Sequence, residues 1–146
     1  MELKIRKTHP AAVIPSRATG GSAGLDLSAA VDAPVVIEPG GIAAISTGLA
    51  IELPEKDMVA LMFTRSSLGV KHGVSLVNSV GVIDSDYRGT ISIVLINHSR
   101  IPFCVNSGDR LAQLIITPVI PLEVVVVEEL SDTSRGMGGF GSTGVN

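Results

Sequence analysis

Apolar and polar residues along the chain are arranged in short runs that predict β-strands. Leu3 and Ile5 alternate with charged neighbours, which is the pattern of a strand with one buried face. Further apolar, β-branched runs recur about every ten residues, separated by clusters of Gly, Pro, Asn and Asp that favour turns. We interpret these runs as strands over 24–30, 35–37, 42–45, 48–53, 58–63, 74–77, 91–96, 111–116 and 124–127.

This pattern predicts an all-β fold, either a sandwich or a barrel, with at most one short helix. No stretch of about ten residues keeps a helical period. The exception is the segment 65–68, RSSL, where a serine at the N-cap would open a short helix. We find no repeat and expect one β domain over 1–130. Residues 131–146 are polar and glycine-rich, which predicts a flexible tail.

The composition narrows the class of protein. The chain has 146 residues, which suits one domain. Hydrophobic residues make up 45% and aromatic residues only 3%, so the core must be built from Val, Ile, Leu and Ala. Such a surplus of aliphatic surface in a small chain points to a buried subunit interface. The net charge of −3 offers no broad basic face, so we expect no nucleic-acid partner.

The cysteine count and the hydropathy bear on the compartment. Cys104 is the only cysteine, which fits a reducing compartment, and we expect it to be a small core residue. No apolar run approaches the ~18 residues of a membrane span. The start, MELKIRKTH, also lacks the apolar stretch of a signal peptide. We therefore expect a cytoplasmic protein with no membrane partner.

The segment 81–89, GVIDSDYRG, concentrates candidate chemistry. If it is extended, Asp84 and Asp86 point to the same side, because alternate residues of a strand share a face. Two nearby carboxylates raise each other's proton affinity, which is one way to build a base that activates water. The same residues suit a polar turn, in which Asp and Gly serve the backbone conformation.

Two other segments place polar groups beside apolar runs. At 65–69, RSSLG offers a guanidinium, hydroxyls and unpaired backbone N–H groups at a helix start, a combination that binds phosphate. A capped helix with a solvent-facing arginine fits the segment equally. Gln113 is the polar residue of the run 111–116, where a buried amide would need partners; an edge strand facing water is the alternative. Zinc-ligand spacing is absent from the three histidines, His9, His72 and His98.

The tail combines a cation, an aromatic ring and two hydroxyls in a glycine-rich background. These groups belong to Arg135, Phe140, Ser142 and Thr143. They are suited to closing over a bound nucleotide. Taken alone, the segment is more typical of a solvated tail of no further function.

In this order, five segments resemble the motifs of the trimeric dUTPases, enzymes that hydrolyse deoxyuridine triphosphate. The order and spacing of the five make the resemblance specific, and it spans nearly the whole chain. One departure is Thr64, where the family more often has Pro or Gly; it touches a backbone position and leaves the chemistry intact. The segments are AGLDLSAA at 23–30, TRSSLG at 64–69, GVIDSDYRG at 81–89, GDRLAQLI at 108–115 and RGMGGFGSTG at 135–144.

The resemblance implies a jelly-roll β-barrel assembled as a homotrimer, with active sites shared between subunits. It implies that Asp84 is the general base for attack of water on the α-phosphorus of dUTP, which yields dUMP and pyrophosphate. This reaction keeps uracil out of DNA and supplies dUMP for thymidylate synthesis. Tyr87 would lie against the deoxyribose and exclude a 2′-hydroxyl. The hairpin that carries Asn78 would read uracil, largely through backbone groups.

The resemblance also implies roles for the phosphate and tail residues. A triphosphate carries about four negative charges, so cations must neutralise it before water can approach phosphorus. Because Mg²⁺ keeps several waters when it binds phosphate, no cage made of protein alone is expected. The implied phosphate ligands are Arg65, Ser66, Ser67 and Gln113, with Asp26 acting through water on a triphosphate-bound Mg²⁺. In the tail, Arg135 would meet the γ-phosphate and Phe140 would stack on uracil, with Ser142 and Thr143 beside the nucleotide.

Two other functions stay open on this evidence. A dCTP deaminase shares the fold, but its catalytic group is a Glu and it lacks the aromatic, glycine-rich tail motif. A trimeric β-barrel without catalytic activity, acting as a binding module, is the alternative from another class. Asp84 and Phe140 favour hydrolysis over deamination. The intact base and phosphate-binding groups argue against a pure binding module, which would need no Asp at position 84.

Overall fold

The computed structural model of the chain describes residues 1–139. In that range the chain forms short strands joined by turns, and one short helix between two of the strands. The elements are β1 (Lys4–Lys7), β2 (Leu25–Ser28), β3 (Val35–Ile37), β4 (Ile42–Ser46), β5 (Leu49–Glu52), β6 (Met58–Thr64), α1 (Ser66–His72), β7 (Val74–Leu76), β8 (Val80–Ile83), β9 (Ser92–Asn97), β10 (Phe103–Val105) and β11 (Arg110–Pro118).

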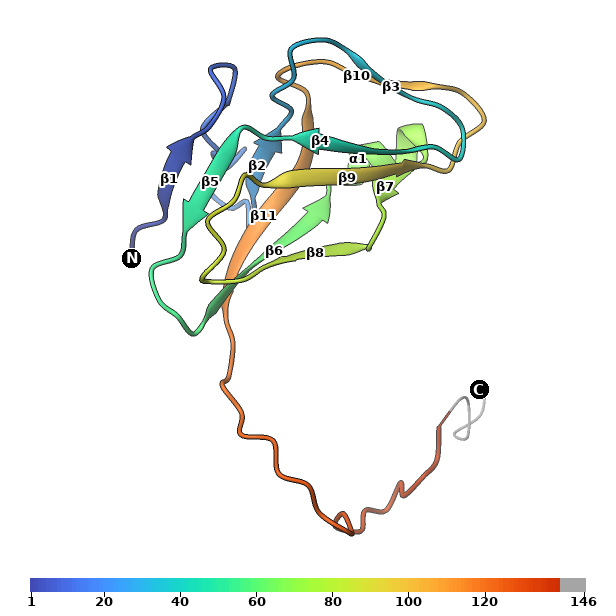
Figure 1. Cartoon of the computed structure of the whole chain (residues 1–146). Helices are drawn as coiled ribbons and strands as arrows, with labels where there is room; N and C mark the ends of the chain where they lie inside the picture. The colour runs from blue at the N-terminus through green and yellow to red at the C-terminus, as the bar shows by residue number, and fades with distance from the viewer. Residues whose placement is uncertain (140–146) are drawn as a thin grey trace.

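The strands form antiparallel ladders. The largest sheet has the order β2-β11-β6-β8, and the second has the order β4-β9-β7. Two ribbons, β1-β5 and β10-β3, complete the body. Figure 1 shows the two larger sheets facing each other across the body. The prediction of an all-β fold with one short helix is confirmed, and the fold is of the jelly-roll type.

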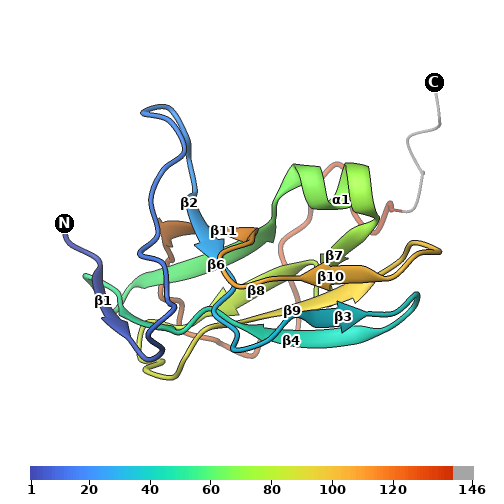
Figure 2. The same cartoon turned by 90° about the horizontal axis from the view of Figure 1, so that it is seen from above.

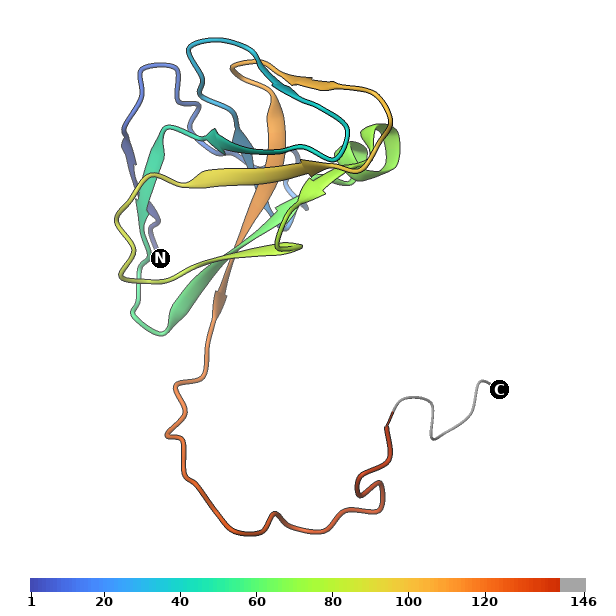
Figure 3. The same cartoon turned by 45° about the vertical axis from the view of Figure 1, so that its right-hand side comes forward.

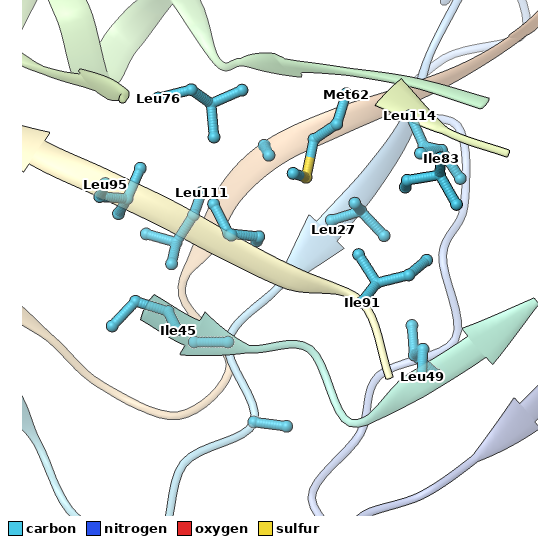
Figure 4. Packing of buried hydrophobic residues seen from close by; sticks show 14 of the residues in the cluster. Leu27, Ile45, Leu49, Met62, Leu76, Ile83, Ile91, Leu95, Leu111 and Leu114 are labelled. Atoms are coloured by element: carbon cyan, nitrogen blue, oxygen red, sulfur yellow. The ribbon is translucent and has the colours of Figure 1, made fainter. Parts of the chain in front are cut away.

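The core between the sheets is aliphatic. Alternate residues of β9, such as Ile93 and Leu95, are fully buried, because successive side chains of a strand point to opposite faces. Leu27 and Leu114, from neighbouring strands of the larger sheet, belong to the same buried cluster (Figure 4). The composition therefore predicted the core correctly: it consists of Leu, Ile, Val, Ala and Met side chains.

The structure corrects the strand prediction and the expected burial of Cys104. The run 124–127 forms no strand, although its valines are β-branched, because from Ile120 on no neighbouring strand of the chain pairs with this segment. Cys104 is exposed, because the adjacent residue of β10, Val105, points into the core and neighbouring side chains of a strand point to opposite faces. The pattern also missed two short strands: β8, over Val80–Ile83, and β10, which is only three residues long and follows a proline.

Past β11, the chain leaves the body. Val119 donates its N–H to the carbonyl of Asp57 at 2.9 Å, and residues 120–139 then run away from the body without helix or strand. Figures 1 and 3 show this arm extending from one end of the body. The valines of 124–127 are 55–94% exposed in the single chain. The arm therefore carries apolar side chains that its own body does not cover.

Helix α1 lies beside β7 at one end of the body (Figure 2). It ends at Gly73, whose φ of 64° is in the left-handed region that favours glycine. The N-cap is Arg65 and makes no side-chain capping bond, so the expected serine cap is wrong. Ser66 is instead the first helical residue. No helix of the described residues is long and apolar enough to cross a membrane.

Candidate functional site

The predicted catalytic aspartate opens onto a cleft of about 280 Å³, called here the Asp84 cleft. It lies between β8, which is an edge strand of the larger sheet, and β9 of the second sheet. The turn between β7 and β8 closes one end. Its lining consists of Met62, Asn78, Gly81, Val82, Ile83, Asp84, Tyr87, Thr90, Ile91, Ser92 and Val94.

Asp84 is the first residue after β8, and its side chain is exposed to the cleft. The chain turns immediately, because Tyr87 donates its N–H to the carbonyl of Asp84 at 3.1 Å. Asp86 lies within this turn and does not line the cleft. The segment is therefore not extended past Ile83, and the premise for placing the two carboxylates on one face is wrong. A single carboxylate, that of Asp84, faces the Asp84 cleft.

The loop 84–90 is held by hydrogen bonds at several positions that follow Asp84. Ser85 donates its hydroxyl to the carbonyl of Lys56 at 2.8 Å, which ties the turn to the chain before β6. Arg88 donates to the carbonyls of Ser85 and Tyr87 at 2.8 and 3.1 Å. The Thr8 and Thr90 hydroxyls lie 2.9 Å apart, within hydrogen-bond distance. These bonds hold the Asp84 backbone in one place, so its carboxylate is presented to the cleft from a fixed base.

Two further predicted site residues reach the same cleft. Asn78 lies in the β7–β8 turn, where Ser79 adopts a positive φ of 62° and Val80 donates its N–H to the Asn78 carbonyl at 2.6 Å. Tyr87 is 46% exposed and donates its hydroxyl to the carbonyl of Thr90 at 3.2 Å. A hairpin turn, a carboxylate and an aromatic ring therefore surround one cavity.

The remaining predicted polar residues of the body gather in a second hollow of about 250 Å³, called here the Asp26 cleft. It lies where β2, β11 and the start of α1 meet. The two clefts share no lining residue. The Asp26 cleft is lined by Ala18, Ser22, Gly24, Asp26, Arg65, Ser66, Ser67 and Gln113.

Two ion pairs organise the Asp26 cleft. One carboxylate oxygen of Asp26 lies 3.3 Å from Nε of Arg65, and the other accepts a hydrogen bond from Nη1 of Arg110 at 3.0 Å. The Asp26 side chain is only 15% exposed, so little water screens its contact with Arg65, whereas the Arg110 side chain is 54% exposed. Arg65 is 26% exposed and is therefore not the solvent-facing arginine of the simpler interpretation. The pairing leaves a net positive charge beside the Ser66 and Ser67 hydroxyls.

Gln113 is opposite Asp26 in the β2–β11 register. Because β11 has β2 on one side and β6 on the other, the interpretation as an edge-strand glutamine is wrong. Gln113 packs over Gly24, where an added Cβ would lie 2.7 Å from Oε1 and 3.0 Å from Cβ of the glutamine. Gly24 therefore leaves room for the amide within the cleft.

Sequence reasoning missed two residues of this region. Arg110 was part of a motif, but nothing in its spacing predicted a pair with Asp26, which is 84 residues away. Thr64 was noted only as a departure from the family. Its hydroxyl accepts a hydrogen bond from the N–H of Leu76 at 2.9 Å, which joins the end of β6 to β7. The side chain that departs from the family pattern thus has a structural contact of its own.

The donors of the Asp26 cleft determine what kind of metal site fits there. Across residues 1–139, no group of three or more His, Cys, Asp or Glu side chains is placed to hold an ion. Both oxygens of Asp26 already pair with guanidinium groups, so a directly bound ion would compete with two arginines. A hydrated Mg²⁺ that is carried in by phosphate oxygens fits better, because it meets the carboxylate through water.

The predicted tail residues stand apart from both clefts or outside the described range. Arg135 lies in the arm, where it donates from Nε to the carbonyl of Gly138 at 2.8 Å, and it lines neither cleft. The predictions for Phe140, Ser142 and Thr143 lie outside the described residues. In the single chain, the tail predictions therefore stay predictions.

The chain matches known proteins over nearly its full length. The family model for dUTPase matches residues 11–144. A deoxyuridine 5′-triphosphate nucleotidohydrolase of Desulfitobacterium hafniense is 52% identical over 133 residues, which cover 91% of this chain and 88% of the relative.

Solved structures that are similar to this chain are also dUTPases. A Staphylococcus bacteriophage 80alpha dUTPase with dUPNHPP has a TM-score of 0.86 at 29% identity and covers 99% of both chains. A mutant dUTPase from phage phi11 of S. aureus, described with a structural Mg(II) ion, has a TM-score of 0.82 at 28% identity, covering 90% of this chain and 100% of that one. The chain described here belongs to the dUTPase family.

Proposed function

We propose that this chain, a dUTPase-family enzyme that hydrolyses dUTP to dUMP, does so with Asp84 as the general base. Asp84 takes a proton from a water molecule as the water oxygen forms a bond to the α-phosphorus. The bond between the α-phosphorus and the bridging oxygen to the β-phosphorus breaks, and pyrophosphate leaves with the electron pair. The observation that carries this proposal is the anchored, cleft-facing carboxylate of Asp84 beside Tyr87 and Asn78.

The other residues of the Asp84 cleft serve recognition in this proposal. Uracil lies against the β7–β8 turn at Asn78, where backbone groups read its edge. The Tyr87 ring lies against the deoxyribose and leaves no space for a 2′-hydroxyl, so ribonucleotides are excluded by shape. The support is that both residues line the cavity that Asp84 faces.

The Asp26 cleft supplies the phosphate contacts. The guanidinium of Arg65, the hydroxyls of Ser66 and Ser67, and the Gln113 amide are polar donors that face one hollow, as a polyphosphate requires. Mg²⁺, bound mainly by phosphate oxygens and held to Asp26 through water, would neutralise charge on the triphosphate. From the tail 131–146, Arg135 meets the γ-phosphate, Phe140 stacks on uracil, and Ser142 and Thr143 lie beside the nucleotide.

We further propose a homotrimer in which the barrel, residues 1–130, contributes its two clefts to different active sites. A single nucleotide has to meet both the base and the phosphate donors, yet the clefts share no lining residue within one chain. The aliphatic arm, which its own body leaves uncovered, supports contact with a second copy. The sole cysteine fits the cytoplasm as the compartment.

An assay with dUTP and Mg²⁺ tests the function. We expect equal amounts of dUMP and pyrophosphate, and loss of turnover when Mg²⁺ is chelated. A parallel reaction with dCTP should release no ammonia. Ammonia from dCTP would instead identify a deaminase, and binding of dUTP without turnover would identify a binding module.

A further inference from the structure

We propose that Gly89 is a positioning residue for nucleotide selectivity, because the Tyr87 ring packs directly on the Gly89 backbone. The inference builds on the proposed role of Tyr87 against the sugar. It concerns a residue that takes no part in the chemistry and carries no side chain of its own.

The contact between the two residues is unusually close. A Cβ built on Gly89 would overlap the Tyr87 hydroxyl oxygen and would lie 2.5 Å from Cζ and 2.9 Å from Cε2 of the ring. Real Cβ atoms essentially never approach other heavy atoms within 3.0 Å. The ring of Tyr87 therefore occupies the space that any side chain at position 89 would need.

Backbone conformation does not explain the glycine. Gly89 is not among the described glycines with positive φ, such as Gly73 and Gly108, so another residue could adopt its backbone angles. What the position requires is the absence of a side chain. The requirement comes from the Tyr87 ring.

The ring has few other supports. Tyr87 is 46% exposed, so the hydrophobic core does not hold it. At its tip, the hydroxyl donates to the carbonyl of Thr90 at 3.2 Å, and the Thr90 side chain lies 2.9 Å from the Thr8 hydroxyl. The ring is thus fastened at one end and rests on the Gly89 backbone, with Asp84 in the same cleft.

A methyl group at position 89 would therefore displace the ring more readily than the backbone. Hydrogen bonds of Ser85 and Arg88 hold the loop backbone, whereas a half-exposed tyrosine side chain can rotate away from the Gly89 backbone. Once the ring has moved, the space that it denied to a 2′-hydroxyl is open. Asp84 keeps its anchoring, so hydrolysis of dUTP continues.

A double-mutant cycle tests the proposal through the ratio of kcat/KM for dUTP over UTP. Rejection of a hydroxyl by shape alone is on the order of 100-fold, so we expect Gly89→Ala to lower the ratio by roughly tenfold or more. Tyr87→Ala should lower it similarly, and the double variant should lower it no further. The matched control is Gly20→Ala, where an added Cβ meets nothing within 4 Å, and it should keep the wild-type ratio.

A structural readout accompanies the kinetics. Tyr87 is the only tyrosine of the chain, so its ring protons give a single set of NMR signals without assignment by mutation. In the wild type, these protons should show nuclear Overhauser contacts to the Gly89 α-protons. In Gly89→Ala, the ring signals should shift while the rest of the spectrum stays that of the folded protein.

Three results would overturn the proposal. The first is a wild-type selectivity ratio in Gly89→Ala when Tyr87→Ala lowers that ratio. The second is an additive loss in the double variant, because position 89 would then act independently of the ring. The third is a ring that moves in Gly89→Ala while the selectivity ratio stays unchanged in both single variants. Gly89 would then position the ring, but the proposed role of Tyr87 in selectivity would be wrong.

Discussion

Mixing two inactive variants distinguishes a site built within one chain from a site shared between copies. Asp84→Asn removes the carboxylate of the Asp84 cleft, and Arg65→Ala removes a cation of the Asp26 cleft. Each variant alone should be nearly inactive. If one nucleotide uses the Asp84 cleft of one subunit and the Asp26 cleft of another, mixed trimers will contain intact combinations.

The magnitude follows from the two separate clefts. In an equal mixture, an intact Asp84 comes from an Arg65→Ala chain at half of the sites. The intact Arg65 of the other subunit comes from an Asp84→Asn chain with the same frequency. Random assembly in a closed ring therefore makes about a quarter of the sites complete. After joint unfolding and refolding, pyrophosphate release should rise from near zero to roughly that fraction of the wild-type rate.

Matched controls show whether recovered activity requires one intact cleft from each variant. A mixture of Asp84→Asn with Asp84→Ala should stay inactive, because every Asp84 cleft remains defective. A mixture of Arg65→Ala with Gln113→Ala should also gain nothing, since both changes lie in the Asp26 cleft. Native mass spectrometry should confirm mixed trimers. Mixed trimers without recovered activity would refute the shared site.

The remaining predictions concern single positions. Asp84→Asn should keep the fold and dUTP binding but lower kcat by about two or more orders of magnitude, the usual cost of losing a general base; turnover near the wild-type rate would exclude this role. Tyr87→Ala should lower the selectivity for dUTP over UTP more than it lowers dUTP turnover, as paired kcat/KM values would report. Tryptic cleavage at the exposed Arg135 should slow with a non-hydrolysable dUTP analogue and Mg²⁺, and equal rates would contradict tail closure. Gly24→Ala should displace the amide of Gln113 and weaken dUTP binding by about 1.5–3 kcal/mol, the value of a hydrogen bond to a charged group; unchanged affinity by calorimetry would argue against that contact.

The strand prediction succeeded where local alternation decides the structure. Ile93 and Leu95 of β9 could be assigned to the core because side chains two residues apart share a face. The prediction failed for the valines at 124–127, where it rested on β-branched composition, since a strand also needs a neighbour to which its backbone can bond. It failed for Asp84 and Asp86 as well, because a turn starts at Asp84.

The sequence by itself determined the all-β class, the aliphatic core and the residue types of the candidate site, because alternation and composition are properties of neighbouring residues. Only the tertiary structure decided which of those residues meet. It separated Asp84 from Arg65 into two clefts and joined Asp26 to Arg110 across 84 positions. Contacts of this kind follow from the order and register of paired strands. No periodicity within a single segment encodes them, since each strand can pair with several others until the whole core is packed.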